Sequence, residues 1–275
     1  MLRTRIVTAV VCLALFLAAL FLFPPIGWIG FCTATLGVAA WEWGALAGLT
    51  VAARHVYGVL VAAAFFLAES LGGAPKDGFQ LPLDVYYAGA LFWVIVAPLW
   101  LWQRPRVAQT LMLIVGVVAL VPAFAAAVDL RGDAGPARLV AVLAIVWISD
   151  SAAYFVGSAF GRHKLAPSIS PGKTWEGVLG ALVAVGIYAP VWVGVGGPAS
   201  LPERLNRGAE GALWFTGILI GLAVVGMIGD LFESLIKRQA GVKDSGTLLP
   251  GHGGILDRID APVAMLPVAV LVFMK

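Results

Sequence analysis

The sequence predicts an all-α, polytopic integral membrane protein of about nine transmembrane helices. Its 275 residues are 61% hydrophobic and only 12% charged, with a mean hydropathy of +0.96. Soluble domains carry about 25% charged residues, because polar side chains must cover their surface. A disordered chain is excluded as well, since disorder needs low hydrophobicity and high charge. The net charge of +3 is spread over loops and gives no support for a nucleic-acid partner.

Nine apolar runs approach or reach the roughly 20 residues that a helix needs to cross a bilayer. They are Ile6–Phe23, Ile26–Leu46, Val56–Leu71, Val85–Trp102, Val107–Val128, Leu139–Phe160, Val178–Val195, Ala212–Ile228 and Ala261–Met274. Arg3 and Arg5 precede the first run as in a signal peptide, but no small-residue cleavage site follows it, and Pro24-Pro25 leads directly into the second run. We therefore expect a retained helix. Cys12 and Cys32 lie in apolar runs, so neither a disulfide framework nor a thiolate metal cluster is expected.

The distribution of Lys and Arg predicts the orientation. With the N-terminus in the cytoplasm, twice as many basic residues lie on the inner side as on the outer side, and the C-terminus lies outside. The two inner loops, Gly161–Gly177 and Asp230–Asp260, hold most of the unusual polar residues. We therefore expect an active site in a polar cavity that faces the cytoplasm. The chain divides into N-terminal transmembrane helices, 1–138, and a C-terminal catalytic region, 139–275.

The segment that follows the eighth run begins with a row of polar residues. On a continuing helix Asp230, Ser234 and Lys237 lie on one face, and Glu233 flanks it. A carboxylate, a hydroxyl and an ammonium group in one row suit a metal ion and a phosphate together. The alternative is an amphipathic helix end whose cations complement the helix dipole.

The next stretch, 242–260, is rich in Gly and Pro and cannot form a regular helix throughout. Such a backbone can turn its N–H groups toward an anion. His252 stands between glycines with a sterically free ring, although a plain loop histidine at the membrane interface is the alternative.

Asp257 and Asp260 lie one helical turn apart, immediately before the last apolar run. That run would form a helix of about 21 Å, against a hydrocarbon core of about 30 Å. Either the last helix is truncated or it begins inside the Gly-rich stretch. The second option buries both carboxylates below the membrane surface. Acidic residues are costly there, so their presence indicates a functional site. Hard oxygen ligands of this kind suit Mg²⁺.

Acidic residues also interrupt the apolar runs themselves. Asp150, with Ser149, Ser151 and Tyr154, lies inside the sixth run, where an interhelical hydrogen-bond cluster is the structural alternative to a functional site. Glu42 is placed to face the same cavity, whereas Glu69 is close enough to a loop to lie at the interface.

The other inner loop contains Gly172-Lys173-Thr174, which suggests a phosphate-binding P-loop. That interpretation fails, because Pro167 stands where the motif needs glycine and no strand is expected before it. Ser170-Pro171 and Thr174 are typical helix starts, so Lys173 would meet a phosphate near a helix N-terminus. The alternative is that the basic residues of this loop only set topology or contact anionic lipids.

Taken together, the C-terminal half resembles the phosphatidate cytidylyltransferases, or CDP-diacylglycerol synthases. The stretch 234–260 meets every fixed position of that family's signature: Ser234, Lys237, Arg238, Lys243, Asp244, Pro250, His252, Gly253, Gly254, Asp257, Arg258 and Asp260. The segments 150–154 and 170–177 also resemble family segments, whereas the N-terminal runs match only in being apolar.

The resemblance implies a Mg²⁺-dependent reaction of CTP with phosphatidate that gives CDP-diacylglycerol and pyrophosphate, in the cytoplasmic membrane of a bacterium. The lipid phosphate would attack the α-phosphorus of CTP, so catalysis depends on positioning and on charge stabilisation. Because the nucleophile is already an anion, no strong base is needed, and His252 would contact phosphate or metal-bound water.

The resemblance also assigns roles to residues. Asp230 and Asp257 would bind the catalytic Mg²⁺, with Asp260 binding it directly or through water. The catalytic set is Asp230, Lys237, Arg238, Lys243, Asp244, Asp257 and Arg258. Substrate would be bound by Lys173, Ser234, His252, Gly253 and Gly254, and the supporting residues are Asp150, Tyr154 and Glu233. A second cation and a homodimer are left open.

Two rival functions fit parts of the pattern. An ion-coupled secondary transporter also has buried carboxylates and broken helices, but its charges belong near the midplane between repeated halves. Here they gather toward one end of one half, and no repeat is evident. A CTP-dependent lipid kinase would transfer the γ-phosphate instead.

Overall fold

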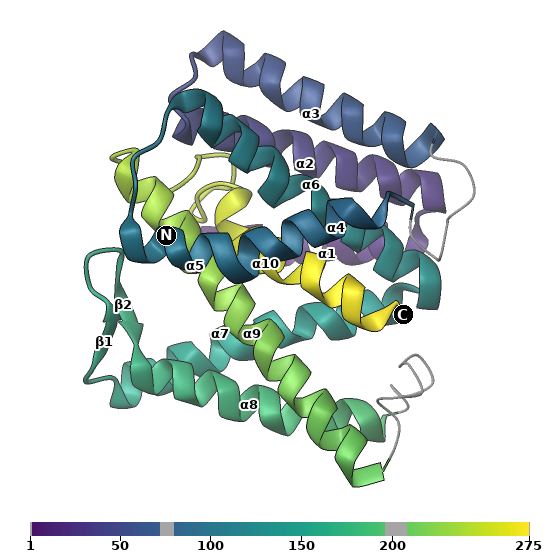
Figure 1. The fold of residues 1–275 in the computed structure, drawn as a ribbon, viewed down its shortest axis with the longest axis vertical. Helices are drawn as coiled ribbons and strands as arrows, with labels where there is room; N and C mark the ends of the chain where they lie inside the picture. Colours follow the sequence, from purple (N-terminus) through teal and green to yellow (C-terminus); the bar gives the residue numbers. More distant parts are fainter. Residues whose placement is uncertain (1, 72–79, 196–207, 275) are drawn as a thin grey trace.

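The computed structural model describes residues 2–71, 80–195 and 208–274, apart from the side chains of 2–5 and 133–134. This part forms a bundle of helices with one small hairpin (Figure 1). The elements are α1 (Leu2–Leu22), α2 (Pro25–Leu46), α3 (Val51–Leu71), α4 (Leu83–Leu91), the π-helical turn η1 (Phe92–Val96), α5 (Ala97–Gln103), α6 (Gln109–Ala134), α7 (Pro136–Phe160), β1 (Lys164–Ala166), β2 (Ser170–Thr174), α8 (Trp175–Gly194), α9 (Gly208–Gln239) and α10 (Leu256–Phe273).

Each of the nine apolar runs corresponds to helix, with the fourth run continuous through α4, η1 and α5. Six helices are long and apolar enough to cross a membrane: Val51–Leu71, Leu83–Gln103, Gln109–Gly132, Pro136–Phe160, Trp175–Gly194 and Gly208–Gln239. In α1 the described apolar stretch, Ile6–Leu22, is shorter, and α10 carries three charged residues near its start. The prediction of a polytopic helical membrane protein is therefore confirmed, and the number nine stays a prediction.

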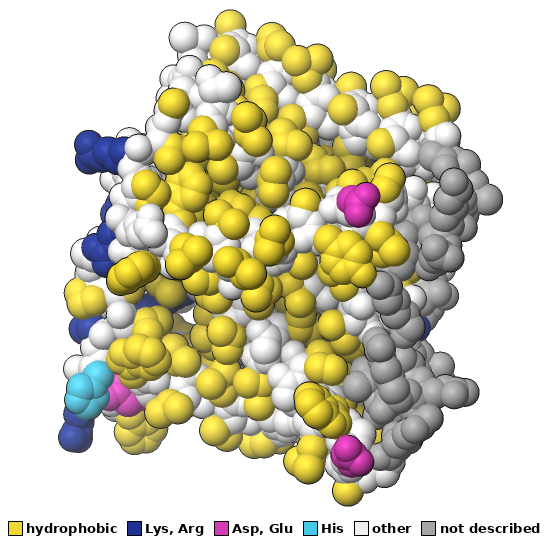
Figure 2. Space-filling view, viewed as in Figure 1, with side chains coloured by type: hydrophobic (Ala, Val, Ile, Leu, Met, Phe, Trp, Pro, Cys, Tyr) yellow, Lys and Arg dark blue, Asp and Glu magenta, His cyan; other side chains and the backbone are white. Residues whose placement is uncertain are grey.

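The outer surface of the bundle is apolar, as a bilayer requires. Leu22, Trp102 and Leu213 are each more than 70% exposed, and many other large apolar side chains also face outward. Figure 2 shows apolar side chains over the middle of one face, with Lys and Arg mainly along the edge where β1 and β2 lie. Exposed apolar surface of this extent is typical of contact with lipid and not with water.

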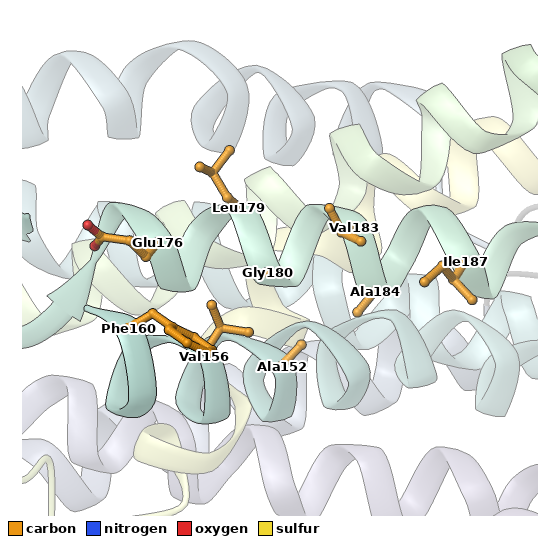
Figure 3. Close-up of a pocket in the computed structure, with 9 residues that line it drawn as sticks. All are labelled: Ala152, Val156, Phe160, Glu176, Leu179, Gly180, Val183, Ala184 and Ile187. Atoms are coloured by element: carbon orange, nitrogen blue, oxygen red, sulfur yellow. The ribbon is translucent and has the colours of Figure 1, made fainter. Parts of the chain in front are cut away.

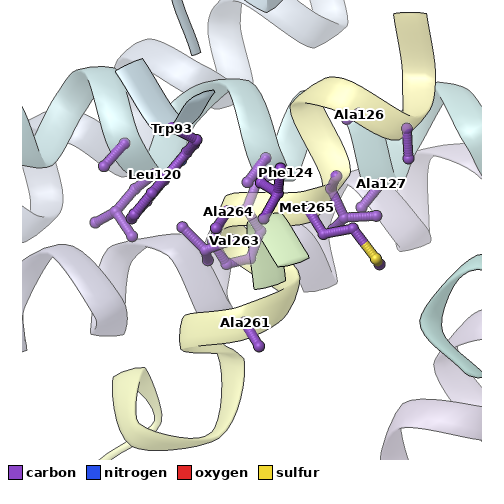
Figure 4. Close-up of a cluster of buried hydrophobic side chains, with 14 of the residues drawn as sticks. Trp93, Leu120, Phe124, Ala126, Ala127, Ala261, Val263, Ala264 and Met265 are labelled. Carbon is purple, nitrogen blue, oxygen red and sulfur yellow. The ribbon is translucent and has the colours of Figure 1, made fainter. Parts of the chain in front are cut away.

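The last helix lies in the core and not at the periphery. Residues of α10 such as Ala264 and Met265 are fully buried, and α10 packs against α9, α6 and α4 (Figure 4). At Gly229 of α9 a Cβ would lie 2.5 Å from the Cβ of Ala264 and 2.6 Å from the carbonyl oxygen of Asp260, so only glycine permits this approach. α10 begins at Leu256, inside the Gly-rich stretch, and the second of the two options for this helix is confirmed.

The loop before α8 differs from the prediction. Ser170-Pro171 does not start a helix but belongs to β2, which pairs antiparallel with β1. Proline and the residue before it favour extended backbone, and here the hairpin satisfies that preference. Thr174 does start a helix, because its Oγ1 accepts a hydrogen bond from the Gly177 N–H (3.2 Å) as the N-cap of α8.

Candidate active site

The residues singled out by the sequence gather at one end of the bundle, where α9 ends, α10 begins and the hairpin lies (left side of Figure 1). Helix α9 continues to Gln239, so Asp230, Ser234 and Lys237 lie on one face as predicted. The Ser234 hydroxyl lies 3.4 Å from Asp230 Oδ1. Lys237 is only 8% exposed, and its Nζ lies 2.6 Å from Glu233 Oε2. This end of α9 is therefore a buried polar site, not a solvated amphipathic face.

A salt bridge joins the two inner loops. Lys173 Nζ, on β2, lies 2.6 Å from Asp230 Oδ2, with both side chains partly exposed. Asp150 on α7 interacts electrostatically with Asp230 and Lys173. Asp260 on α10 interacts in the same way with Asp230 and Glu233. Carboxylates from α7, α9 and α10 thus interact with the charge of Lys173. This lysine lies on β2, directly before Thr174, the N-cap of α8, and so near a helix N-terminus as predicted.

Asp257 is the most completely hydrogen-bonded carboxylate of the site. Its Oδ1 accepts from Lys237 Nζ (2.5 Å). Its Oδ2 accepts from the Ser245 N–H (2.9 Å), the Ser245 hydroxyl (3.0 Å) and the Gly254 N–H (2.8 Å). Burial of an anion is costly, but these four donors offset that cost. The side chain therefore fastens the loop between α9 and α10 as an anion.

That loop, residues 240–255, is tightly folded. Gly251 and Gly253 have φ near +80°, and Leu249 pairs with Gly253 in an antiparallel bridge. A Cβ on Gly253 would lie 2.5 Å from Asp257 Oδ2, so this glycine lets the backbone close over the carboxylate. His252 is half-buried, and its Nδ1 has no hydrogen-bond partner in the described part of the chain.

The remaining predicted residues divide into two groups. Arg238 ties the hairpin to the loop, because its guanidinium donates to the carbonyl oxygens of Ile169 (3.3 Å) and Val242 (3.2 Å). The structure does not bring four other residues into these contacts. Three of them are exposed and form no side-chain hydrogen bond within the described ranges: Lys243, Asp244 and Arg258. The fourth, Tyr154, is 71% exposed and packs edge-on against Phe155.

Two residues of the site were given no role by sequence reasoning, although Glu42 was expected to face the same cavity. Ser245 links the loop to Asp257, and Glu42, from α2, accepts hydrogen bonds from the same loop. The signal for Glu42 was an acidic residue inside an apolar run, but its partners lie about 200 positions later and no spacing rule connects them. Glu69 lies near the end of α3 and is buried within the protein, and its position at the membrane interface stays a prediction.

The donor set fits Mg²⁺ only with help from substrate. Among the described residues no three His, Cys, Asp or Glu side chains lie close enough to enclose a metal ion. Mg²⁺ usually takes one or two carboxylates together with substrate phosphates and water. Asp230 and Asp260 offer carboxylate oxygens of this kind, and neither is held by four donors as Asp257 is.

A separate groove of about 510 Å³ runs between α7 and α8 (Figure 3). Its lining is apolar except for Glu176 at one end, whose Oε1 lies 2.6 Å from His163 Nδ1. A groove with this lining has no cation for a phosphate, and we do not assign the reaction to it.

The fold and the clustered charges define a class: a helical membrane protein with acidic and ammonium groups gathered at one end, suited to chemistry on phosphate esters. Comparison with known proteins is more specific. The chain belongs to the cytidylyltransferase family, whose model matches residues 3–274.

Full-length relatives agree with this assignment. The chain is 38% identical over 283 residues to a phosphatidate cytidylyltransferase of Pseudomonas aeruginosa, covering 98% of this chain and 95% of that protein. It is 34% identical over 284 residues to that of Haemophilus influenzae, covering 97% and 96%. The phosphatidate cytidylyltransferase of Thermotoga maritima is 41% identical over 141 residues, 51% of this chain and 50% of that protein.

Proposed function

We propose that this chain is a phosphatidate cytidylyltransferase: it transfers CMP from CTP to phosphatidate and releases CDP-diacylglycerol and pyrophosphate. The similarity over nearly the whole chain to two enzymes of that name carries the proposal. The site is chemically suited to this reaction. Two phosphate-bearing anions react only where positive charge is concentrated, and the carboxylates of the site can hold a metal ion that adds to that charge.

In the proposed reaction an oxygen of the phosphatidate phosphate forms a bond to the α-phosphorus of CTP. The bond from that phosphorus to the bridging oxygen breaks, and pyrophosphate leaves with the electron pair. Lys173 is partly exposed and reaches the site from the hairpin, so its ammonium group can exchange Asp230 for a phosphate. Lys237 is held by Glu233 and Asp257 and offers a fixed positive charge beneath the loop.

Magnesium, when bound, would neutralise phosphate charge and favour departure of pyrophosphate. We assign its carboxylates to Asp230 and Asp260. Direct binding by Asp257, which the family signature implies, requires some of its four donors to move away. If these donors stay in place, Asp257 instead orients Lys237 and the loop.

The remaining signature residues have proposed roles at the substrate. Lys243, in the loop, and Arg258, in the first turn of α10, are exposed cations that can bind the triphosphate. The Nδ1 of His252, which has no hydrogen-bond partner within the described ranges, can bind phosphate or metal-bound water. Asp150 supports the charge balance around Lys173 and Asp230.

The proposed orientation places the N-terminus and both inner loops at the cytoplasmic face of the cytoplasmic membrane, with nine spans. The excess of Lys and Arg on that side supports it, as does their position beside the hairpin in Figure 2. CTP is soluble and phosphatidate lies in the bilayer, so a site at this end of the bundle is open to both.

The test uses purified full-length protein with CTP labelled in its cytidine, Mg²⁺ and vesicles that contain phosphatidate or diacylglycerol. We expect label to enter the lipid, with pyrophosphate released, only when phosphatidate is present. Label that stays in CDP while diacylglycerol is phosphorylated would instead show a lipid kinase. Absence of CTP turnover under any condition would contradict the proposal and leave transport as the rival.

A further inference from the structure

Glu42 is a completely buried carboxylate in α2, far in sequence from the family signature. An ionised carboxylate in an apolar surrounding is costly unless donors satisfy it. Its donors all come from the signature region. Oε1 accepts from the Ile255 N–H (3.0 Å), and Oε2 accepts from the Leu256 N–H (2.8 Å) and from the Ser245 hydroxyl (3.1 Å).

Two of these donors are backbone N–H groups at the start of α10. The first N–H groups of a helix have no partner inside the helix and are usually satisfied by a nearby side chain. In α10 the N-cap residue, Ile255, supplies no such hydrogen bond. Glu42 therefore caps α10 from another helix, and its negative charge suits the positive end of the helix dipole.

The glycines of the loop are shaped around the same carboxylate. A Cβ on Gly254 would lie 2.5 Å from each Glu42 oxygen, and one on Gly246 would overlap Oε1. The loop backbone thus encloses the Glu42 carboxylate on two sides. Part of the glycine content of the signature is explained by this contact, without reference to a phosphate.

From Glu42 the contacts continue into the catalytic residues. The Ser245 hydroxyl lies between Glu42 Oε2 and Asp257 Oδ2, and its single hydrogen serves one of them at a time. Asp257 in turn holds Lys237. We propose that Glu42 is a positioning residue: it fixes the signature loop and the first turn of α10, and through Ser245 it sets the orientation of Asp257 and Lys237 toward CTP. This inference rests on the proposed function.

The substitution Glu42→Gln tests it with little change in volume. Both oxygens of Glu42 accept a backbone N–H, so the amide nitrogen of Gln must face one of those donors and lose that bond. We expect kcat/KM for CTP to fall by about 10- to 100-fold, with a rise in KM for CTP as a main component. Glu42→Asp keeps both acceptors and should recover part of the loss.

Glu69→Gln is the matched control. Glu69 is also a buried carboxylate in a neighbouring helix, α3, and neither of its oxygens has a hydrogen-bond partner in the part of the chain that the structure describes. We expect its KM and kcat to stay within about twofold of wild type. A purely structural loss at Glu42 would lower the active fraction, and so kcat, but would leave KM unchanged.

Three results would overturn the inference: an unchanged KM for CTP in Glu42→Gln, an equal change in Glu69→Gln, or, should Glu42→Gln not fold, an unchanged KM in Ser245→Ala. The last variant removes only the hydroxyl between Glu42 and Asp257. Failure of wild type to make CDP-diacylglycerol would instead refute the proposed function, so the two failures can be told apart.

Discussion

The buried carboxylates at the two ends of the helical bundle differ in how completely they are hydrogen-bonded. At the hairpin end, Glu42 and Asp257 are enclosed by backbone and side-chain donors. At the other end, Asp129 accepts from the Tyr86 hydroxyl and the Gln80 N–H, while the two oxygens of nearby Glu69 have no partner in the described ranges.

We infer from this difference that hydrogen-bond connections, and not burial alone, mark the functional carboxylates of this protein. Donors fix the direction of the Glu42 and Asp257 side chains and connect them to the loop with the family signature. Glu69 is also buried, but among the described residues it has no hydrogen bond that links it to this loop. Function should therefore follow the hydrogen-bond connections, and each end can be tested by removing one carboxylate.

The largest effect is expected at Asp257. In Asp257→Asn one of the two acceptor atoms becomes a donor and faces either Lys237 or the Ser245 and Gly254 donors. Breaking a buried ion pair of this kind costs about 3 kcal/mol. We expect turnover to be abolished and the thermal midpoint in detergent to fall. Normal turnover or an unchanged midpoint would show that the four hydrogen bonds of Asp257 do not hold the loop.

A smaller effect is expected from one methyl group in the loop. In Gly254→Ala the new Cβ would overlap the Ser245 hydroxyl and both oxygens of Glu42, so the loop must shift. We therefore expect kcat/KM for CTP to drop about tenfold or more. Gly172→Ala, in the hairpin, is the control, because a Cβ there has nothing within 4 Å. Equal kinetics for the two variants would contradict the tight enclosure of Glu42.

The smallest effect, and one of opposite sign, is expected at the other end. Glu69→Met replaces two buried oxygens, which have no partner among the residues that the structure describes, with an apolar chain of similar length. We expect the free energy of unfolding to rise by about 1 kcal/mol without change in kcat, and the thermal midpoint in detergent to rise with it. A lowered midpoint would show that Glu69 is stabilising and that the contrast between the ends is wrong.

Much of this organisation could be predicted from the sequence. Apolar runs located the helices, and the helical spacing of Asp230, Ser234 and Lys237 placed them on one face of α9. The prediction of a helix start at Ser170-Pro171 was wrong, because a strand partner at 164–166 is a tertiary feature that local preference does not encode. The four hydrogen bonds of Asp257 could not be predicted either, because its donors reach it only when the loop folds back over the start of α10. The hydrogen bonds of Glu42 were likewise unpredictable, because its partners lie more than 200 positions later in the sequence.

The most direct test of the active-site assignment is to assay wild type and Asp230→Asn together, with cytidine-labelled CTP, Mg²⁺ and phosphatidate vesicles. Asp230 is partly exposed, and its contacts with Lys173 and Ser234 are few, so the variant should fold with an unchanged thermal midpoint. We predict labelled CDP-diacylglycerol from wild type and a loss of at least about 100-fold in the variant. Labelled lipid from neither protein, or equal amounts from both, would contradict the assignment of this charged cluster as the active site.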